Sequence, residues 1–406
     1  MNSNSKQNQR VVSGMRSTGA LHLGHYHGVL KNWVEMQYEH ECFFFAADWH
    51  ALTTHYKDPS QVPQHVTEMV VDWLAAGISP SSATIFLQSQ VPEHAELYLL
   101  LSMLTPVSWL ERVPTYKDQQ QKLKDKDLAN IGFLGYPLLQ AADILIYKAD
   151  LVPVGEDQVS HIELTREVAR RFNYTYGKEP DFEARAESAI MKMGKKGAKM
   201  YRNYRKAYQE SGDKEAVIKG QALLDSQQNI SVGDRERLLG YLEGISKIIL
   251  PEPEAILTKS SKMPGLDGQK MSKSYGNTIP LRSTADEVDE GIRKMPTDPA
   301  RMRRTDAGDP DKCPVWQLHL VYSDEQRQEW VQEGCKTAGI GCLDCKKTII
   351  DAVQAELEPM RERAKVFEED PQAVRNIILE GSESAREIAR ETLDDVIEAM
   401  RFSDFS

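Results

Sequence analysis

Residues 11–25 read Val-Val-Ser-Gly-Met-Arg-Ser-Thr-Gly-Ala-Leu-His-Leu-Gly-His and carry the chain from a short apolar strand into a helix. The pattern predicts the strand at Val11 to Gly14 and the helix from about Leu23 to Val34. In a doubly wound sheet this turn borders the ligand crevice, and the helix N-terminus supplies backbone donors for anionic groups. The stretch therefore predicts a fold class and the place of a binding site together.

Strand and helix patterns alternate on either side of this turn. Apolar strands are expected at Phe43 to Ala47, Ala83 to Leu87 and Val152 to Val154. Helical periodicity fills Pro63 to Ala76 and Glu93 to Leu104 between them. We therefore predict an α/β protein whose doubly wound parallel sheet has helices on both faces.

The rest of the chain breaks this alternation. Residues 185–250 have a basic half, a polar half and no clear strand pattern, which favours a mostly helical insertion. Amphipathic stretches after Ser274 predict a C-terminal helical domain. The expected division is a doubly wound domain at 1–184 and 251–284, the insertion at 185–250, and the helical domain at 285–406.

Composition limits the classes of function. With 40% hydrophobic and 27% charged residues, the chain is typical of globular proteins. No apolar stretch is long enough for a membrane span and residues 1–10 are polar, so we expect a cytoplasmic protein without membrane contact. A net charge of -11 argues against coating of DNA, and RNA would bind through local patches. Arg185 to Lys219, with ten Lys or Arg against four Asp or Glu, is one candidate, and a solvated helix face is the alternative.

Two separated segments carry residues suited to nucleotide chemistry. His22 and His25 flank Gly24, where a flat base can approach the backbone while imidazoles donate to phosphate oxygens. Far downstream, Lys270-Met271-Ser272-Lys273-Ser274 lies among glycines, and its lysines and hydroxyls are suited to hold a leaving pyrophosphate. His-x-Gly-His followed much later by Lys-Met-Ser-Lys-Ser resembles the paired signatures of class I aminoacyl-tRNA synthetases.

Longer matches indicate a subfamily. Tyr136-Pro137-Leu138-Leu139-Gln140-Ala141-Ala142-Asp143 and Leu151-Val152-Pro153-Val154-Gly155-Glu156-Asp157-Gln158 resemble tryptophanyl-tRNA synthetases, as do Ala47 to Thr53 and Met295 to Pro299. The resemblance implies a Rossmann-like catalytic domain, an anticodon-binding helical domain, and activation of L-tryptophan with ATP and Mg²⁺ for transfer to tRNA(Trp). It also implies a homodimer.

The resemblance implies roles for particular residues. Asp143 would accept the indole N–H, and His22, His25, Lys270 and Lys273 would stabilise charge during activation. Its implied tryptophan site contains Asp143, Tyr136, Gln140, Gln158, His50, Gly14 and Val154. Its implied ATP site contains Arg16, Ser17, Thr18, Gly24, His25, Gly155, Glu156, Asp157, Met263, Lys270, Met271, Ser272, Lys273 and Ser274. Many bacterial relatives have methionine in place of Gln140 and glutamine in place of Arg16.

Three alternatives differ from this interpretation. Tyrosyl-tRNA synthetases hold a phenol with residues spaced like Tyr136, Gln140 and Asp143, although the run Gly155 to Gln158 looks tryptophanyl. A small nucleotidyltransferase shares His-x-Gly-His, but would not explain the second lysine loop or the helical domain. A noncatalytic RNA-binding paralogue need not retain both nucleotide loops.

Four of the five cysteines crowd into one C-terminal stretch, while Cys42 lies in an apolar run typical of a buried strand. Four thiolates suggest a tetrahedral sulfur site for zinc or an iron-sulfur cluster, with free buried cysteines as the alternative. The arrangement resembles a subset of tryptophanyl-tRNA synthetases with a [4Fe-4S] cluster near the anticodon site. The expected ligands are Cys313, Cys335, Cys342 and Cys345, with Zn²⁺ as the alternative metal.

Overall fold

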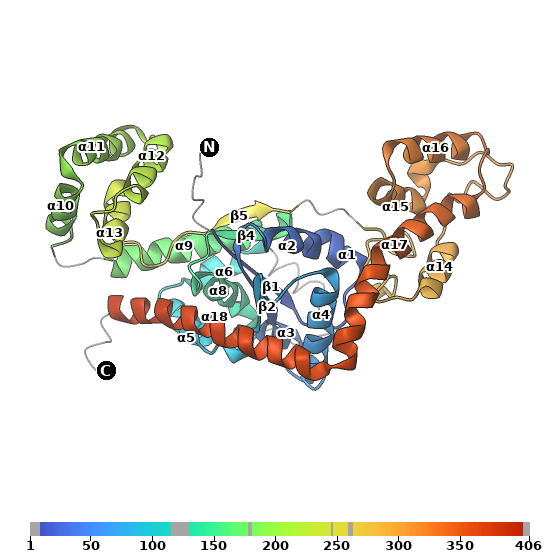
Figure 1. The fold of residues 1–406 in the computed structure, drawn as a ribbon, viewed down its shortest axis with the longest axis horizontal. Coiled ribbons are helices and arrows are strands. Elements are labelled where there is room, and N and C mark those ends of the chain that lie inside the picture. The colour runs from blue at the N-terminus through green and yellow to red at the C-terminus, as the bar shows by residue number, and fades with distance from the viewer. Residues whose placement is uncertain (1–8, 115–129, 178–180, 245–246, 259–262, 401–406) are drawn as a thin grey trace. The chain divides into compact units, whose positions relative to one another are not determined.

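A five-stranded sheet in the order β3-β2-β1-β4-β5 organises the fold (Figure 1). The computed structural model describes residues 9–114, 130–177, 181–244, 247–258 and 263–400. β1 pairs in parallel with β2, and β2 pairs in parallel with β3, which confirms the predicted doubly wound parallel sheet. The strands are β1 (Arg10–Arg16), β2 (Glu41–Ala47), β3 (Ala83–Leu87), β4 (Leu151–Val154) and β5 (Glu254–Leu257).

Aromatic side chains on β2 hold helices against this sheet. Phe44 is fully buried and stacks on Trp33 of α2 (Lys31–Met36), with 4.2 Å between ring centroids. Trp33 meets Trp73 of α4 (Val62–Ala76) edge to face, at 5.2 Å. Burial of each such side chain contributes about 1.5 to 3 kcal/mol. These contacts fix the helices that follow β1 and β2, and with them the turn that leads out of β1.

The first helix differs from the continuous one expected at Leu23 to Val34. It consists of α1 (Leu23–His25), a π-helical segment η1 (Tyr26–Leu30) and α2. Within η1, the Nε2 atom of His27 lies 3.0 Å from both the hydroxyl of Tyr322 and a carboxylate oxygen of Glu356. These contacts of His27 with residues far along the chain account for an irregular turn that local periodicity does not predict.

The first of two compact units comprises Met1–Gln90, Pro153–Glu156 and Ile256–Ser384. It contains β1, β2 and β3, with the signature segments and the cysteines. Its further helices are α3 (Asp48–His55), η2 (Gln88–Gln90), η4 (Lys273–Tyr275), α14 (Ala285–Lys294), η5 (Pro310–Lys312), α15 (Pro314–Tyr322), α16 (Glu325–Lys336), α17 (Cys342–Glu369) and the first part of α18 (Pro371–Ala399).

The second unit comprises Val91–Val152, Asp157–Ala255 and Ala385–Ser406. Among the residues that the structure describes, no helix is both long and apolar enough to span a membrane. The expected division at 1–184, 185–250, 251–284 and 285–406 remains a prediction. The helices of this unit are α5 (Glu93–Ser102), α6 (Val107–Glu111), α8 (Ile131–Leu145), η3 (Glu156–Gln158), α9 (Val159–Tyr176), α10 (Phe182–Lys192), α11 (Gly194–Ser211), α12 (Lys214–Asp225), α13 (Val232–Glu243) and the end of α18.

Candidate active site

The two signature histidines cap the short helix α1. The Nδ1 atom of His22 accepts a hydrogen bond from the backbone N–H of Gly24 at 3.1 Å, and Nδ1 of His25 accepts from the N–H of His22 at 3.2 Å. Their rings lie 3.9 Å apart. Because both Nδ1 atoms are acceptors, a neutral ring carries its proton on Nε2. Each histidine therefore has an Nε2–H that can donate to an oxygen of a bound phosphate.

Burial keeps these rings neutral. Together with the nearby charge of Lys273, it lowers the pKa of His22 from 6.5 to about 4. The pKa of His25 falls to about 3, through burial and then through His22 and Lys273. Near neutral pH both side chains are therefore uncharged hydrogen-bond donors. Burial also lowers the pKa of Lys273 itself, against the opposing charges of Asp72 and Glu68.

The second signature segment reaches the first through Lys273. Its Nζ atom donates to the carbonyl oxygens of Thr18 and Gly19 at 3.0 and 2.8 Å. The chain that follows pairs with the first segment, since the N–H of Leu23 donates to Ile279 and the N–H of Leu281 donates to Leu21. An antiparallel bridge joins His22 and Pro280. The structure thus brings together two signature segments that lie about 250 positions apart in the chain.

Asp72 on α4 supports this turn and was not predicted from the sequence. The side chain is 1% exposed; one carboxylate oxygen accepts from the N–H of Leu21 at 2.6 Å and the other from Nε of Arg282 at 2.7 Å. Leu21, Asp72 and Arg282 line a pocket of about 400 Å³ beside the turn. A lone aspartate stands within the apolar run of α4, which indicates a buried polar residue but not the role of Asp72 at this turn.

Asn277 holds the loop that contains Lys270 to Ser274. Its Oδ1 atom accepts from the N–H of Ser272 at 2.8 Å, and its Nδ2 donates to Asp267 at 2.6 Å and to the carbonyl of Lys270 at 3.2 Å. The backbone of Met271 pairs with Met263, and Lys270 is exposed. The side chain of Ser274 lies outside the described residues. The loop thus presents Lys270 to solvent from a fixed backbone.

The other residues expected at the ATP and tryptophan sites in this unit differ in contacts and in burial. Arg16 donates from Nη2 to the hydroxyl of Thr54 at 2.7 Å. Gly14 must be glycine here, because a β-carbon would lie 2.3 Å from the ring of Phe45. Three more are buried and the others are partly or fully exposed. Buried are Ser17, His50 and Val154; exposed or half-buried are Thr18, Gly155, Glu156 and Asp157.

The second unit contains a buried polar chain around Asp143 on α8. Its Oδ1 atom lies 2.6 Å from Nδ1 of His94 on α5, and Nε2 of His94 lies 2.7 Å from the hydroxyl of Tyr147. All three side chains are at most 1% exposed. Burial, with the charge of Asp143, raises the pKa of Tyr147 well above its usual value, so the hydroxyl stays protonated. Sequence reasoning missed His94, which lies outside the recognised motifs.

Of the other residues expected at the tryptophan site, Tyr136 and Gln140 lie on α8 and Gln158 lies at the end of η3, directly before α9. Tyr136 is buried, and its ring centroid lies 5.6 Å from that of His161. Gln140 is half-buried on the same helix as Asp143. Gln158 donates to the carboxylate of Asp157 at 3.0 Å. Tyr136, Gln140 and Asp143 thus come from one helix, α8, in agreement with their spacing.

Comparison with known proteins identifies the family. Residues 4–206 and 225–358 match the model of tRNA synthetases class I (W and Y). The chain belongs to this family. Tryptophan--tRNA ligase of Ralstonia nicotianae is 64% identical over 97% of this chain and 98% of its own length, and that of Thermotoga maritima is 46% identical over 96% and 98%. The tryptophanyl-tRNA synthetase of Campylobacter jejuni, complexed with ADP and tryptophan, superposes with a TM-score of 0.70 at 28% identity and covers 97% of this chain and 99% of that one.

Membership among the class I synthetases confirms the interpretation of the two signatures. A synthetase of this class joins an amino acid to tRNA, so a small nucleotidyltransferase is no longer an alternative. Sequence likeness to tryptophan enzymes extends along 95% or more of this chain. The likeness therefore extends beyond the motifs quoted above and includes the inserted helices α10 to α13.

Four cysteines of this synthetase lie in the C-terminal helical region: Cys313 directly before α15, Cys335 on α16, and Cys342 and Cys345 on α17. Burial, followed by the effect of the nearby Cys313, Cys335 and Cys342, raises the pKa of Cys345 to about 12. Nε2 of His319 lies 3.2 Å from the sulfur of Cys345. Within the described ranges, no group of three or more His, Cys, Asp or Glu side chains is arranged to hold a metal ion. Four thiols are thus the number and type of side chain that a sulfur-ligated metal requires. Their sulfur atoms are not arranged around a metal position in this structure.

Proposed function

We propose that this protein is a tryptophan–tRNA ligase. It activates L-tryptophan with ATP, supplied as its Mg²⁺ complex, and transfers the activated amino acid to tRNA(Trp). The observation that carries the proposal is the junction of the two signature segments, where Lys273 contacts Thr18 and Gly19 beside His22. The names of the relatives at 64% and 46% identity support the choice of amino acid.

In the first step a carboxylate oxygen of tryptophan attacks the α-phosphorus of ATP. A carboxyl oxygen–phosphorus bond forms, the bond to the bridging oxygen breaks, and pyrophosphate leaves with the electron pair. His22 and His25 donate Nε2–H groups to phosphate oxygens as charge develops. Lys273 exchanges its backbone carbonyl partners for pyrophosphate oxygens, with Lys270 approaching from the solvent side.

In the second step a terminal ribose hydroxyl of tRNA attacks the carbonyl carbon of tryptophanyl-adenylate. An ester bond forms and AMP leaves, so the step needs no further reactant. The proposed role of residues 285–406 is to bind the anticodon, and the enzyme is proposed to act as a cytoplasmic homodimer. ATP is held by backbone and side-chain donors of the signature turn and the Lys270 to Ser274 loop.

Selection of tryptophan is assigned to Asp143. A carboxylate accepts a hydrogen bond, so His94 donates from Nδ1, and its Nε2 then accepts from the hydroxyl of Tyr147. This chain orients the carboxylate that receives the indole N–H. Phenylalanine offers no N–H donor, so it cannot make the hydrogen bond that the indole makes, and this difference opposes its binding.

ATP–pyrophosphate exchange across the twenty amino acids tests the proposal. We expect exchange with tryptophan far above that with tyrosine. Asp143→Ala should weaken use of tryptophan by about 2 to 5 kcal/mol, the scale for losing a buried charged hydrogen bond, while ATP binding persists. Preference for tyrosine would contradict the tryptophan assignment, and unchanged tryptophan affinity in the variant would place the pocket elsewhere.

A [4Fe-4S] cluster on Cys313, Cys335, Cys342 and Cys345 is proposed as a structural group of the C-terminal helices. The number and type of these side chains support it, and Zn²⁺ is the alternative. Protein purified without oxygen should be brown with about four irons per chain, and Cys342→Ser should be colourless. One zinc per chain would refute the cluster, and protein without metal would refute both.

A further inference from the structure

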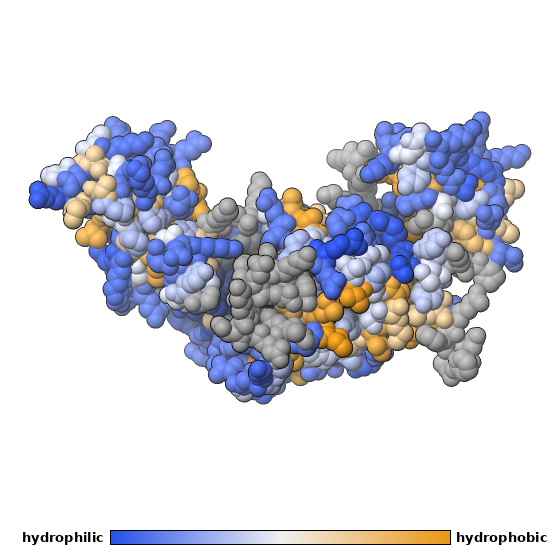
Figure 2. Space-filling view, turned by 180° about the vertical axis from the view of Figure 1, so that it is seen from behind, coloured by the Kyte–Doolittle hydropathy of each residue, from blue (hydrophilic) through white to orange (hydrophobic). Residues whose placement is uncertain are grey.

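Helices α10 to α13 form a module with its own core, here called the inserted module. Ile190, Leu224, Leu238 and Leu242 are buried together with Tyr201, whose hydroxyl donates to the carbonyl of Leu238. This core consists of apolar and aromatic side chains. The numerous lysines and arginines of the module are therefore not required to fill its interior, and most of its visible surface is hydrophilic (Figure 2).

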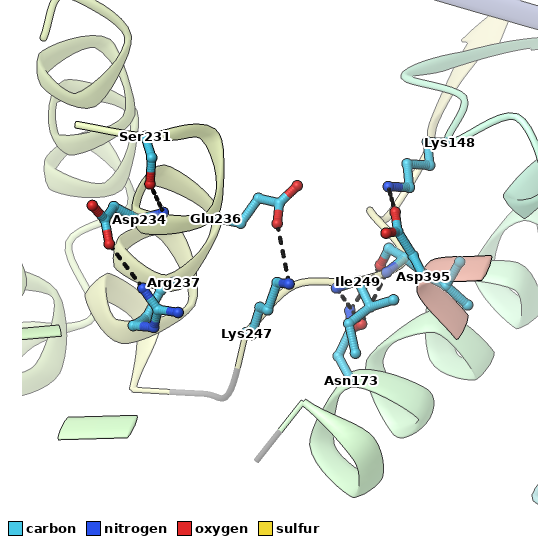
Figure 3. Close-up of polar contacts among 10 residues, drawn as sticks. Lys148, Asn173, Ser231, Asp234, Glu236, Arg237, Lys247, Ile249 and Asp395 are labelled. Carbon is cyan, nitrogen blue, oxygen red and sulfur yellow. Dashed lines mark hydrogen bonds and ion pairs between the residues drawn. The ribbon is translucent and has the colours of Figure 1, made fainter. Parts of the chain in front are cut away.

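The base of the module is fixed by hydrogen bonds to α9. Oδ1 of Asn173 accepts from the N–H groups of Ile249 and Leu250 at 2.9 and 3.0 Å, and Nδ2 donates to the carbonyl of Leu250 at 2.7 Å (Figure 3). The N–H of Lys247 donates to Gly177, and its Nζ atom lies 3.5 Å from Glu236 of α13. These contacts tie Lys247, Ile249 and Leu250, which follow the module in the chain, to the end of α9 and to α13.

One face of α11 carries a row of cations, here called the basic stripe: Lys195, Lys199, Arg202 and Lys206. Their spacing of four, three and four residues places them on one side of the helix over about 17 Å. All four side chains are exposed, and the first three line a hollow of about 540 Å³.

Two of these four charges have an ion-pair partner among the described residues. Within the described part of the chain, Lys195 and Lys199 have no ion pair. Arg202 lies 2.7 Å from Glu187 and Lys206 lies 3.8 Å from Glu210, and both pairs are exposed. Exposed pairs of this kind are weak and exchange readily. The stripe therefore presents available positive charge on a protein whose net charge is -11.

The stripe also opposes the ordinary preferences of a helix. Lys195 with Lys199, and Arg202 with Lys206, are like charges one turn apart and repel. Lys195 and Lys196 stand in a first turn that contains no acidic residue, where the helix dipole disfavours cations. A bound polyanion reverses both effects. Local conflicts of this type are expected where a sequence serves binding rather than folding.

We propose that the basic stripe binds the sugar-phosphate backbone of the tRNA substrate without reading its sequence. The proposal rests on the tRNA-charging function given above. RNA fits because it offers phosphates in a row to cations in a row. An acidic membrane surface fits less well, because the apolar face of α11 is buried in the core of the module and cannot enter a bilayer.

The test compares two double variants of the full-length enzyme. Lys195→Ala with Lys199→Ala removes two charges from the stripe, and the control, Lys214→Ala with Lys219→Ala, removes two exposed lysines from α12 of the same module. We expect the stripe variant to raise the KM for tRNA about tenfold and to lower the slope of log affinity against log salt by about two. ATP–pyrophosphate exchange with tryptophan should match wild type in both variants.

Wild-type tRNA kinetics and an unchanged salt slope in the stripe variant would overturn the proposal and leave a protein partner as the remaining use of the stripe. Equal losses in the control would overturn it too, because general charge would then explain them. Absence of tryptophan exchange in the wild type would instead refute the proposed function. Direct tRNA binding, measured by filter retention, would still decide the role of the stripe in that case.

Discussion

The Nδ1 atom of His94 lies 2.6 Å from the Oδ1 atom of Asp143, in a place from which solvent is almost excluded. These residues are 49 positions apart, on α5 and α8. A carboxylate held in this way can turn little, so its orientation is defined before any ligand arrives. Such preorganisation lowers the ordering cost of binding.

His94→Ala should therefore raise the KM for tryptophan about ten- to a hundredfold, equivalent to about 1 to 3 kcal/mol for a buried acceptor that loses its donor. The KM for ATP should change little. His94→Asn, which keeps a donor, should recover part of the loss. Pyrophosphate-exchange kinetics at varied tryptophan and varied ATP provide the measurement, and equal changes in both KM values would indicate a general structural defect instead.

Lys273→Ala should slow tryptophan activation by about 10² to 10³, the usual scale for losing one donor to transition-state charge. In the proposed mechanism Lys273 donates to pyrophosphate oxygens as charge develops. The kcat should therefore fall more than the affinity for substrate. Lys365→Ala, which removes an exposed lysine paired with Glu362, is the control. A rate close to wild type for Lys273→Ala would remove this residue from the proposed mechanism.

Acid should destabilise the protein through its buried histidines. In the unfolded chain the side chains of His22 and His25 bind protons with a pKa of 6.5. In the folded protein their pKa values are about 4 and about 3, so both stay neutral to lower pH. Unfolding thus takes up protons in this window, so the contribution is full above pH 6.5 and declines as the pH falls. His25→Asn should reduce the slope of the unfolding free energy by about 1.4 kcal/mol per pH unit between pH 6 and pH 4. Urea titrations at several pH values would measure this slope. Equal slopes of unfolding free energy against pH in the wild type and in His25→Asn would contradict the prediction.

Arg282→Ala should lower the free energy of unfolding by about 3 to 5 kcal/mol, since it leaves the buried Asp72 carboxylate without its cation. Arg293→Ala, which breaks an exposed pair with Asp289, should change stability by less than about 1 kcal/mol. Chemical denaturation of both variants gives the comparison. Similar small losses in the two would show that Asp72 is held mainly by the N–H of Leu21.

Much of the sheet could be predicted because its strands carry continuous apolar runs. The segments expected at Val11 to Gly14 and Phe43 to Ala47 lie within β1 and β2, which are slightly longer. β5 was missed, since three of its four residues are exposed and it has no such run. The π-helical segment was missed too, because His27 turns toward partners about 300 residues away.

The residues of the candidate site were also predicted only where a local sequence pattern identified them. His22 and Lys273 could be assigned from motifs, since their own chemistry identifies them. Asp72, His94 and Asn277 could not, because each acts through contacts with residues far along the chain or with backbone groups. A single aspartate, histidine or asparagine has no pattern that distinguishes support of an active site from an ordinary buried polar residue.

The hydrogen bond between Lys247 and Gly177 has a consequence for how this chain can be altered. It brings the entry and the exit of helices α10 to α13 next to each other, so a short linker could join them at little entropic cost. The block can in principle be excised, or exchanged for another domain with adjacent termini, while α9 and β5 keep their places in the chain. Laboratory recombination could therefore move this block between relatives as a single unit.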